Sequence, residues 1–311
     1  MQVVHLEERS VPEALAQSGA ALSVAGQQQT AVLTASVVRG PALILGAMQH
    51  AGRVVELRAC EAAHVPVYRR MTTGTAAWMG GAGLVLSLAL PHVAWIEADA
   101  TARTLLNRNV RPFLRAFSRA GAMAHYFGRE WISLKQRPGA LLGYDVTRTG
   151  GVLIEVITGF DQSIALPAEL TTIHERAIDR CSGKNPASLK EVLPDARLES
   201  FGARVIEGLV EHMGKPVATV DSIASSLPRA VTDARDPLPN GMVPKSLERV
   251  PIGYLDVAVL QDEPQTRAWL GGDVLAPRWL YEAATQRIDV ASLGSVPIDG
   301  AKVEDLVRAM A

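Results

Sequence analysis

The chain of 311 residues has little cysteine, few aromatic side chains and almost no net charge. Its two cysteines, Cys60 and Cys181, cannot build a disulfide framework, which indicates a reducing compartment. The 31 basic and 32 acidic side chains leave a formal net charge of −1, so composition provides no long-range attraction to nucleic acid or to an anionic membrane. Residues 1–9 carry charges where a signal peptide would need an apolar run. We therefore expect a cytoplasmic protein that has neither a nucleic-acid nor a membrane partner.

A membrane span and a metal site are also not expected. Residues 71–96 are uncharged over a length that could cross a bilayer, but threonines, glycines and Pro91 interrupt them. The strongly apolar part, residues 84–90, has the length of a buried strand. The seven histidines show no paired helical spacing, and with two distant cysteines nothing resembles a structural zinc site.

Hydrophobic patterning predicts strands and helices that alternate through most of the chain. Helices are predicted at 14–23, 54–63 and 99–119, and strands at 30–38, 42–46, 65–68, 84–90, 131–135, 141–146 and 151–158. Ser10 and Glu13 form a capping box before the first helix, and Pro112 kinks or restarts the third. This order predicts an α/β (α+β) fold with a mixed sheet flanked by helices.

The last third of the chain reads as a separate unit. Prolines lie among polar residues from 225 to 251, which is typical of a linker. Beyond it, strands at 254–260 and 267–270 and helices near 277–286 and 300–310 predict a small α+β module. We therefore divide the chain into a large domain (1–224), a linker (225–251) and a C-terminal accessory domain (252–311).

Several short motifs follow one another along nearly the whole chain. They are Gly46 with Gln49, Arg69-Arg70-Met71-Thr72, Gly128-Arg129, Leu142-Gly143, a glycine-led strand from Gly151, the segment 184–194, Gly253-Tyr254, and Leu270-Gly271-Gly272-Asp273. In this order and spacing they resemble the lipoate–protein ligase A family of the biotin/lipoate ligase superfamily. The resemblance implies a biotin/lipoate-ligase-like fold with an accessory domain.

The same resemblance implies a two-step reaction. A carboxylic acid such as lipoate or octanoate reacts with ATP, with Mg²⁺ as the usual metal, to give an acyl-adenylate. The acyl group then passes to a lysine of an acidic lipoyl or acyl-carrier domain, which would be the partner.

The residues that should carry this chemistry differ from the family pattern. Where the family has Arg-Arg-x-Thr-Gly-Gly-Gly-Ala, this chain places threonines at Thr73 and Thr75 beside Gly74, and β-branched residues restrict the backbone and fill space. Further differences are Ala47 for an arginine, Met79 for a histidine, and Glu130-Trp131 for an Asn-Asp pair. The lysine that serves the family as its main cation is Ala140, and losing one such group typically costs about 100- to 1000-fold in rate.

Lys135 could replace the missing lysine from across a hairpin. Pro138-Gly139 suits a type II turn at residues 137–140. In this register, and in one that begins a residue earlier, Lys135 and Ala140 lie on the same side of the sheet. The alternative interpretation is a solvent-facing lysine, which is the commoner situation.

Two functions remain open at this point. The first is a lipoate-ligase-like protein that activates and transfers an acyl or lipoyl group, with Lys135 as substitute catalytic cation. Its expected ligand-binding residues are Arg70, Thr72, Thr73, Gly74, Thr75, Ala76, Met79, Ala140 and Gly143. The second is a non-catalytic pseudoenzyme that serves as a binding or scaffold protein. An intermediate possibility is a pocket whose residues have changed to bind another small carboxylic acid.

Two smaller features also leave alternatives. Cys181 could act as an acyl-transfer nucleophile, although His174 is about 10 Å away on an unbroken helix. A row of arginines at 108, 111, 115 and 119 predicts a solvated helix face, or else a docking surface for an acidic protein partner.

Overall fold

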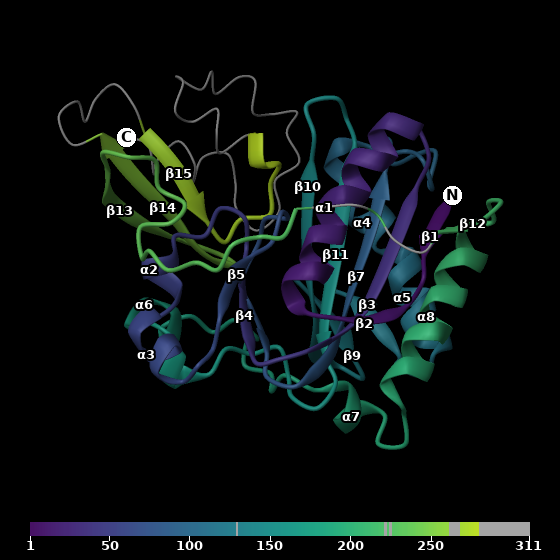
Figure 1. The fold of residues 1–311 in the computed structure, drawn as a ribbon, viewed down its shortest axis with the longest axis horizontal. Helices are drawn as coiled ribbons and strands as arrows, with labels where there is room; N and C mark the ends of the chain where they lie inside the picture. Colours follow the sequence, from purple (N-terminus) through teal and green to yellow (C-terminus); the bar gives the residue numbers. More distant parts are fainter. Residues whose placement is uncertain (129, 221–222, 224–225, 261–267, 280–311) are drawn as a thin grey trace.

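The computed structural model describes residues 1–128, 130–220, 223, 226–260 and 268–279 (Figure 1). The helices predicted near 277–286 and 300–310 lie almost entirely outside these ranges, as does the start of the strand predicted at 267–270. None of the helices within the described ranges combines the length and the apolar character that a bilayer crossing requires.

A mixed nine-stranded sheet lies at the centre of the fold; a mixed sheet was predicted, but no strand was predicted at residues 2–4, 7–9, 124–126 or 218–220. Its strands are β1 (Gln2–Val4), β2 (Glu7–Arg9), β3 (Val32–Arg39), β7 (Ala82–Leu90), β8 (Ala124–Tyr126), β9 (Trp131–Leu134), β10 (Arg137–Val146), β11 (Val152–Gly159) and β12 (Ala218–Val220). They are ordered β12-β1-β3-β7-β11-β10-β9-β8, and β2 also pairs with β3. The pairs among β12, β1, β2 and β3 are parallel and the others are antiparallel.

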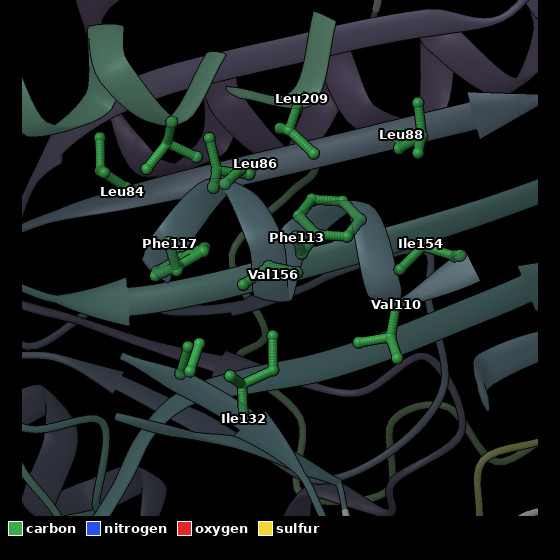
Figure 2. Close-up of a cluster of buried hydrophobic side chains, with 14 of the residues drawn as sticks. Leu84, Leu86, Leu88, Val110, Phe113, Phe117, Ile132, Ile154, Val156 and Leu209 are labelled. Atoms are coloured by element: carbon green, nitrogen blue, oxygen red, sulfur yellow. The ribbon is translucent and has the colours of Figure 1, made fainter. Parts of the chain in front are cut away.

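Helices cover both faces of this sheet because the side chains of each strand alternate in direction. On one face, Leu84, Leu86 and Leu88 pack against α5 (Arg111–Arg119) and α8 (Leu198–Met213), as Figure 2 shows. On the other face lies α1 (Val11–Gln28), which begins where the Glu13 carboxylate accepts the Ser10 N–H at 2.8 Å. The predicted helix at 99–119 is divided into η1 (Ala102–Thr104), α4 (Leu105–Asn109) and α5, and Pro112 lies in the first turn of α5.

A smaller sheet packs beside the first one. In it β4 (Ala42–Leu45) lies between β5 (Val67–Arg69) and β6 (Ala77–Met79). The helix predicted at 54–63 is found in part: α3 (Leu57–Ala62) lies within it, but α2 (Ala51–Val54) is a separate helix, because Val55 is extended and bridges to Thr171. The remaining short helices are η2 (Ala168–Leu170), α6 (Ile173–Arg176) and α7 (Leu189–Val192).

The β9–β10 hairpin turns earlier than the sequence predicts. Lys135 and Gln136 form its two-residue loop with φ of +45° and +70°, so the turn predicted at 137–140 is wrong. Positive φ at both loop residues gives the backbone twist that fits a two-residue hairpin. Pro138 and Gly139 instead lie in β10, at a bulge between Pro138 and Ala140 where a proline is tolerated.

The accessory module contains a three-stranded antiparallel sheet. It is formed by β13 (Met242–Val250), β14 (Gly253–Leu260) and β15 (Ala268–Gly272). Residues 242–250, predicted as part of the linker, are therefore a strand. The prolines misled the prediction, because Pro244 lies at a bulge of an edge strand. Residues 226–241, which precede this sheet, run along β5, where Val231 donates to the Val67 carbonyl at 2.7 Å.

Candidate functional site

A cavity of about 490 Å³ lies beneath the β9–β10 hairpin, and we call it the Trp131 cavity. Thr75 and Ala76, just before β6, form one side of it, and Trp131, Pro138 and Leu141 of the hairpin form another. The chain between residues 164 and 186 completes it. Its volume lies within the usual range of about 300 to 1,000 Å³ for small-molecule sites, and much of its lining is apolar.

Charged groups of both signs line the cavity. The acids are Glu130, Glu175 and Asp179, and the bases are Arg176 and Arg180. Arg176 donates to the carbonyl oxygens of Ala168 and Thr171. The walls thus lack the strong excess of positive charge that would favour a polyanionic ligand.

Arg180 joins the cavity wall to the accessory module. Its guanidinium donates to both oxygens of Glu175 at 2.8 and 2.5 Å, and it lies 2.9 Å from a carboxylate oxygen of Asp273. It also donates to the Ile252 carbonyl at 2.7 Å, while its own carbonyl accepts the Trp131 indole N–H at 3.2 Å. Burial lowers the pKa of Arg180, but the carboxylates of Asp273 and Glu175 outweigh it and raise the pKa above the usual arginine value.

Asp273 also bonds to the chain that follows β4 of the small sheet. The Gln49 amide donates to Asp273 at 2.6 Å, and its oxygen accepts the Gly46 N–H at 2.8 Å. Gly46, Gln49, Asp273, Arg180 and Glu175 therefore form one hydrogen-bonded chain, which we call the Arg180 clamp.

Arg70 lies outside the cavity and is fully buried. Its guanidinium donates to the carbonyl oxygens of Thr72 and Thr73 at 3.3 and 3.0 Å. Desolvation lowers the pKa of Arg70 to about 10, against the opposing charge of Glu155. Thr72 donates to the same Glu155 carboxylate, so this cluster already contains its own anion.

The loop at Thr73 and Gly74 is covered by the accessory module. The Thr73 hydroxyl donates to the Ala276 carbonyl at 2.7 Å and accepts the Ala276 N–H at 3.1 Å. A Cβ at Gly74 would lie 2.7 Å from a methyl carbon of Leu275. Nearby, Asp145 accepts two hydrogen bonds from Arg278 at 2.6 and 2.9 Å.

The structure divides the residues predicted for the pocket. Thr75 and Ala76 line the Trp131 cavity. Arg70, Thr72 and Gly143 lie together in the buried cluster, where a Cβ at Gly143 would come within 2.5 Å of the Thr72 hydroxyl. Met79 and Ala140 are fully buried core residues.

Lys135 is not where the sequence analysis places it. It lies at the tip of the hairpin, and its ammonium donates to the Val192 carbonyl at 2.6 Å. Ile132, not Lys135, is the partner of Ala140 across the ladder. The predicted placement is wrong because it assumed a turn at Pro138-Gly139.

Glu155, Glu175 and Arg180 could not be identified from the sequence as parts of these clusters. Asp273 was noticed only as part of a glycine-rich motif, and no local pattern marks Arg180 or Glu175. Cys181 does line the cavity. However, α6, which contains His174, ends at Arg176, so no unbroken helix connects His174 to Cys181. The His174 ring lies 3.5 Å from the Arg53 guanidinium.

ATP and Mg²⁺ do not fit the residues that surround the Thr72–Thr75 loop. The nearest cation, Arg70, is fully buried and donates to two backbone carbonyls, with Glu155 as a nearby opposite charge, and Leu275 and Ala276 cover the loop. In the described ranges, no three His, Cys, Asp or Glu side chains are grouped in a way that could hold a metal ion. We therefore derive no step through a nucleotide.

Solved structures with a similar fold are lipoate–protein ligases. LipL1 of P. falciparum, solved in complex with lipoate, has a TM-score of 0.66 at 11% identity, covering 91% of this chain and 87% of that one. A bi-partite lipoate protein ligase of Thermoplasma acidophilum, described with its E2 lipoyl domain, has a TM-score of 0.54 at 13% identity, covering 71% and 87%. Lipoate-protein ligase A bound with ATP has a TM-score of 0.53 at 14% identity, also covering 71% and 87%.

In sequence alone, no protein-family model and no curated protein matches the chain. The structural similarity shows the fold: the chain has the biotin/lipoate-ligase-like fold that the motifs predict, with a mixed sheet flanked by helices.

Proposed function

We propose that this protein binds a lipoyl- or octanoyl-type acyl group in the Trp131 cavity and does not activate it with ATP. It would be a non-catalytic protein on the scaffold of a lipoate ligase. Lipoate is the ligand in the LipL1 structure. The apolar lining between Ala76, Trp131 and Leu141 suits an acyl chain.

The observation that carries the proposal is that the polar groups of the Thr72–Thr75 loop bond within the protein and that Leu275 and Ala276 cover the loop. A loop that cradles phosphates needs accessible backbone amides and free cations. Here the Thr73 N–H donates to the Tyr144 carbonyl at 2.9 Å, and the Thr73 hydroxyl is bonded to Ala276. Arg70 is fully buried beside the opposite charge of Glu155, and Leu275 and Ala276 cover the loop, so the guanidinium is not exposed to a triphosphate.

Calorimetry with octanoate or lipoate, with and without ATP and Mg²⁺, tests binding. We expect the acid to bind and ATP to leave its affinity unchanged. Ala76→Leu adds volume inside the cavity and should weaken binding about tenfold or more, whereas Ala62→Leu at an exposed position of α3 should not. Absence of binding by either acid would refute the proposal.

Mass spectrometry tests the absence of activation. The protein is incubated with the acid, ATP, Mg²⁺ and a lipoyl domain that carries its target lysine. We expect neither acyl-AMP nor acylated lipoyl domain; the appearance of either would establish the ligase function instead.

Cys181 supports a second candidate function, because it lines the same cavity. Its thiolate could attack an octanoyl thioester, form a new thioester and release the carrier thiol. An octanoyl adduct that forms on the protein but not on Cys181→Ser would favour this transferase function over simple binding.

A further inference from the structure

Strand β8 ends the nine-stranded sheet beside an exposed apolar surface. Among the described strands it pairs only with β9. Met123 and Phe127 flank it and are 57% and 53% exposed. Edge strands are usually protected by charge, proline or a covering segment, so large apolar side chains at both ends of an edge strand indicate a contact surface.

The two faces of β8 differ in character. Because side chains alternate along a strand, Met123, His125 and Phe127 share one face. The rings of His125 and Phe127 are 6.1 Å apart, and the Lys184 ammonium lies 5.3 Å from the Phe127 ring. This face therefore offers apolar and aromatic surface.

The opposite face borders a basic groove. A hollow of about 430 Å³ lies between α4, α5 and β8, and its lining includes Asn107, Arg108, Arg111, Leu114 and Tyr126. Among the residues that the structure describes, no carboxylate lines it. Arg108 is paired with Asp99 at 2.5 Å, whereas Arg111 forms no ion pair with any residue that the structure describes.

We propose that β8 and this groove bind an extended segment of a partner protein in which acidic and apolar residues alternate. In a segment lying along β8, successive side chains point to opposite faces. Its apolar side chains would lie beside Met123 and Phe127, and its carboxylates would face Arg111 and Arg108. The apolar face and the net charge of −1 favour such a segment over nucleic acid.

This inference selects between the two interpretations of the arginine row. Arg119 pairs with Glu211, and Arg115 hydrogen-bonds to His212 at 2.8 Å, so the end of α5 is engaged within the protein. The docking role is confined to the Arg108–Arg111 end. The proposal does not depend on the ligand of the Trp131 cavity.

Fluorescence anisotropy with short labelled peptides tests the proposal. The probe alternates glutamate and valine; one control has the same composition in two blocks, and another has lysine in place of glutamate. We expect the alternating peptide to bind at least about tenfold more tightly than either control, and more weakly as salt rises.

Variants locate the site. Arg111→Glu should weaken binding of the alternating peptide about tenfold or more, and a glutamate suits the N-terminal turn of α5, so folding should be retained. Phe127→Ser should also weaken binding, and Arg119→Glu on the same helix should not. Equal binding of the three peptides, no binding at all, or insensitivity to Arg111→Glu would each overturn the proposal. So would binding at this groove by an oligonucleotide or by anionic phospholipid vesicles in place of the peptide.

Discussion

Arg70 illustrates how far a single residue can be interpreted from sequence. The motif around it predicts a ligand-binding arginine, yet the guanidinium is fully buried with Glu155 nearby. Whether an arginine meets a ligand or an internal carboxylate depends on a strand much later in the chain, β11, which no local pattern connects to it. The sequence could identify the residue but not its partner.

Gly143 permits this buried cluster, which gives a first prediction. A Cβ there would lie 2.5 Å from the Thr72 hydroxyl and 3.0 Å from the Arg70 guanidinium. Gly143→Ala should therefore lower the free energy of unfolding by about 1 to 3 kcal/mol in urea denaturation. The control is Gly26→Ala in α1, where a Cβ meets no atom within 4 Å and helix propensity should raise stability by about 0.5 to 1 kcal/mol. Equal effects at the two glycines would contradict the argument.

His212 gives a pH-dependent prediction. Burial, and then the charge of Arg115, lower its pKa in the folded protein. A histidine with a depressed pKa favours folding fully above its unfolded pKa of about 6.5, and that contribution is lost as the pH falls through the folded pKa. Stability should thus drop from about pH 7.5 to about pH 5.5, and it should drop less in His212→Gln. Denaturation curves at both pH values measure this difference. His92→Gln, at an exposed site, is the control for the loss of one titratable imidazole ring. An unchanged drop in His212→Gln would show that other groups are responsible.

At the level of elements, the long central strands were predicted, but the short strands β1, β2, β6, β8 and β12, the helix α8 and the β9–β10 turn were not. Alternation and β-branched residues located β3, whereas largely apolar runs located β7 and β11, which are buried along their whole length. The β9–β10 turn was misplaced because Pro-Gly is a stronger local signal than Lys-Gln, although tertiary contacts hold Pro138 and Gly139 in the strand: Ala187 donates to the Pro138 carbonyl and Thr158 to that of Gly139. The helix predicted at 54–63 is interrupted for a similar reason, because Val55 is extended and bridges to Thr171.

The Lys135-Gln136 turn can be made more stable by substitution, which gives a third prediction. Gln136 has a φ of +70°, a conformation that costs a residue with a Cβ about 1 kcal/mol or more and glycine little. Gln136→Gly should raise the free energy of unfolding by about 0.5 to 1 kcal/mol, despite the extra entropy of the unfolded chain. Gln136→Ala removes the same polar group but keeps the Cβ, so it should give no gain. If alanine stabilises as much as glycine, backbone strain at this turn is not the cause.

At the level of the whole molecule, the general architecture could be predicted, but the contacts between the accessory module and the rest of the chain could not. The motif order predicted the fold, and β14 and β15 of the accessory module lie where strands were expected. The start of that module at β13 was hidden by prolines, and the residues that join it to the large domain are far apart in sequence. The Arg180 clamp, like the Trp131 cavity it borders, exists only after the chain has folded.

The clamp gives a fourth prediction. Arg180→Met would leave the buried carboxylates of Glu175 and Asp273, 6% and 3% exposed, without their common cation. Removing one partner of a buried ion pair typically costs about 3 to 5 kcal/mol. We expect a loss of this size in urea denaturation and faster proteolysis within residues 226–241. Arg39→Met is the control, because Arg39 and its partners Glu8 and Glu199 are exposed and such pairs contribute about 1 kcal/mol or less. Matching losses in the two variants would show that Arg180 does not hold the module in place.

The clamp also has a consequence for biosynthesis. Gln49 and Asp273 are 224 positions apart, and the ribosome adds about 5 to 20 residues per second. Asp273 is therefore synthesised roughly ten seconds or more after Gln49, and the Gln49 amide has no acceptor during that time. Ala47 and Met48 stay uncovered for a similar time, because the strands that bury them are also made late. During translation this uncovered apolar corner is a natural place for a chaperone to bind.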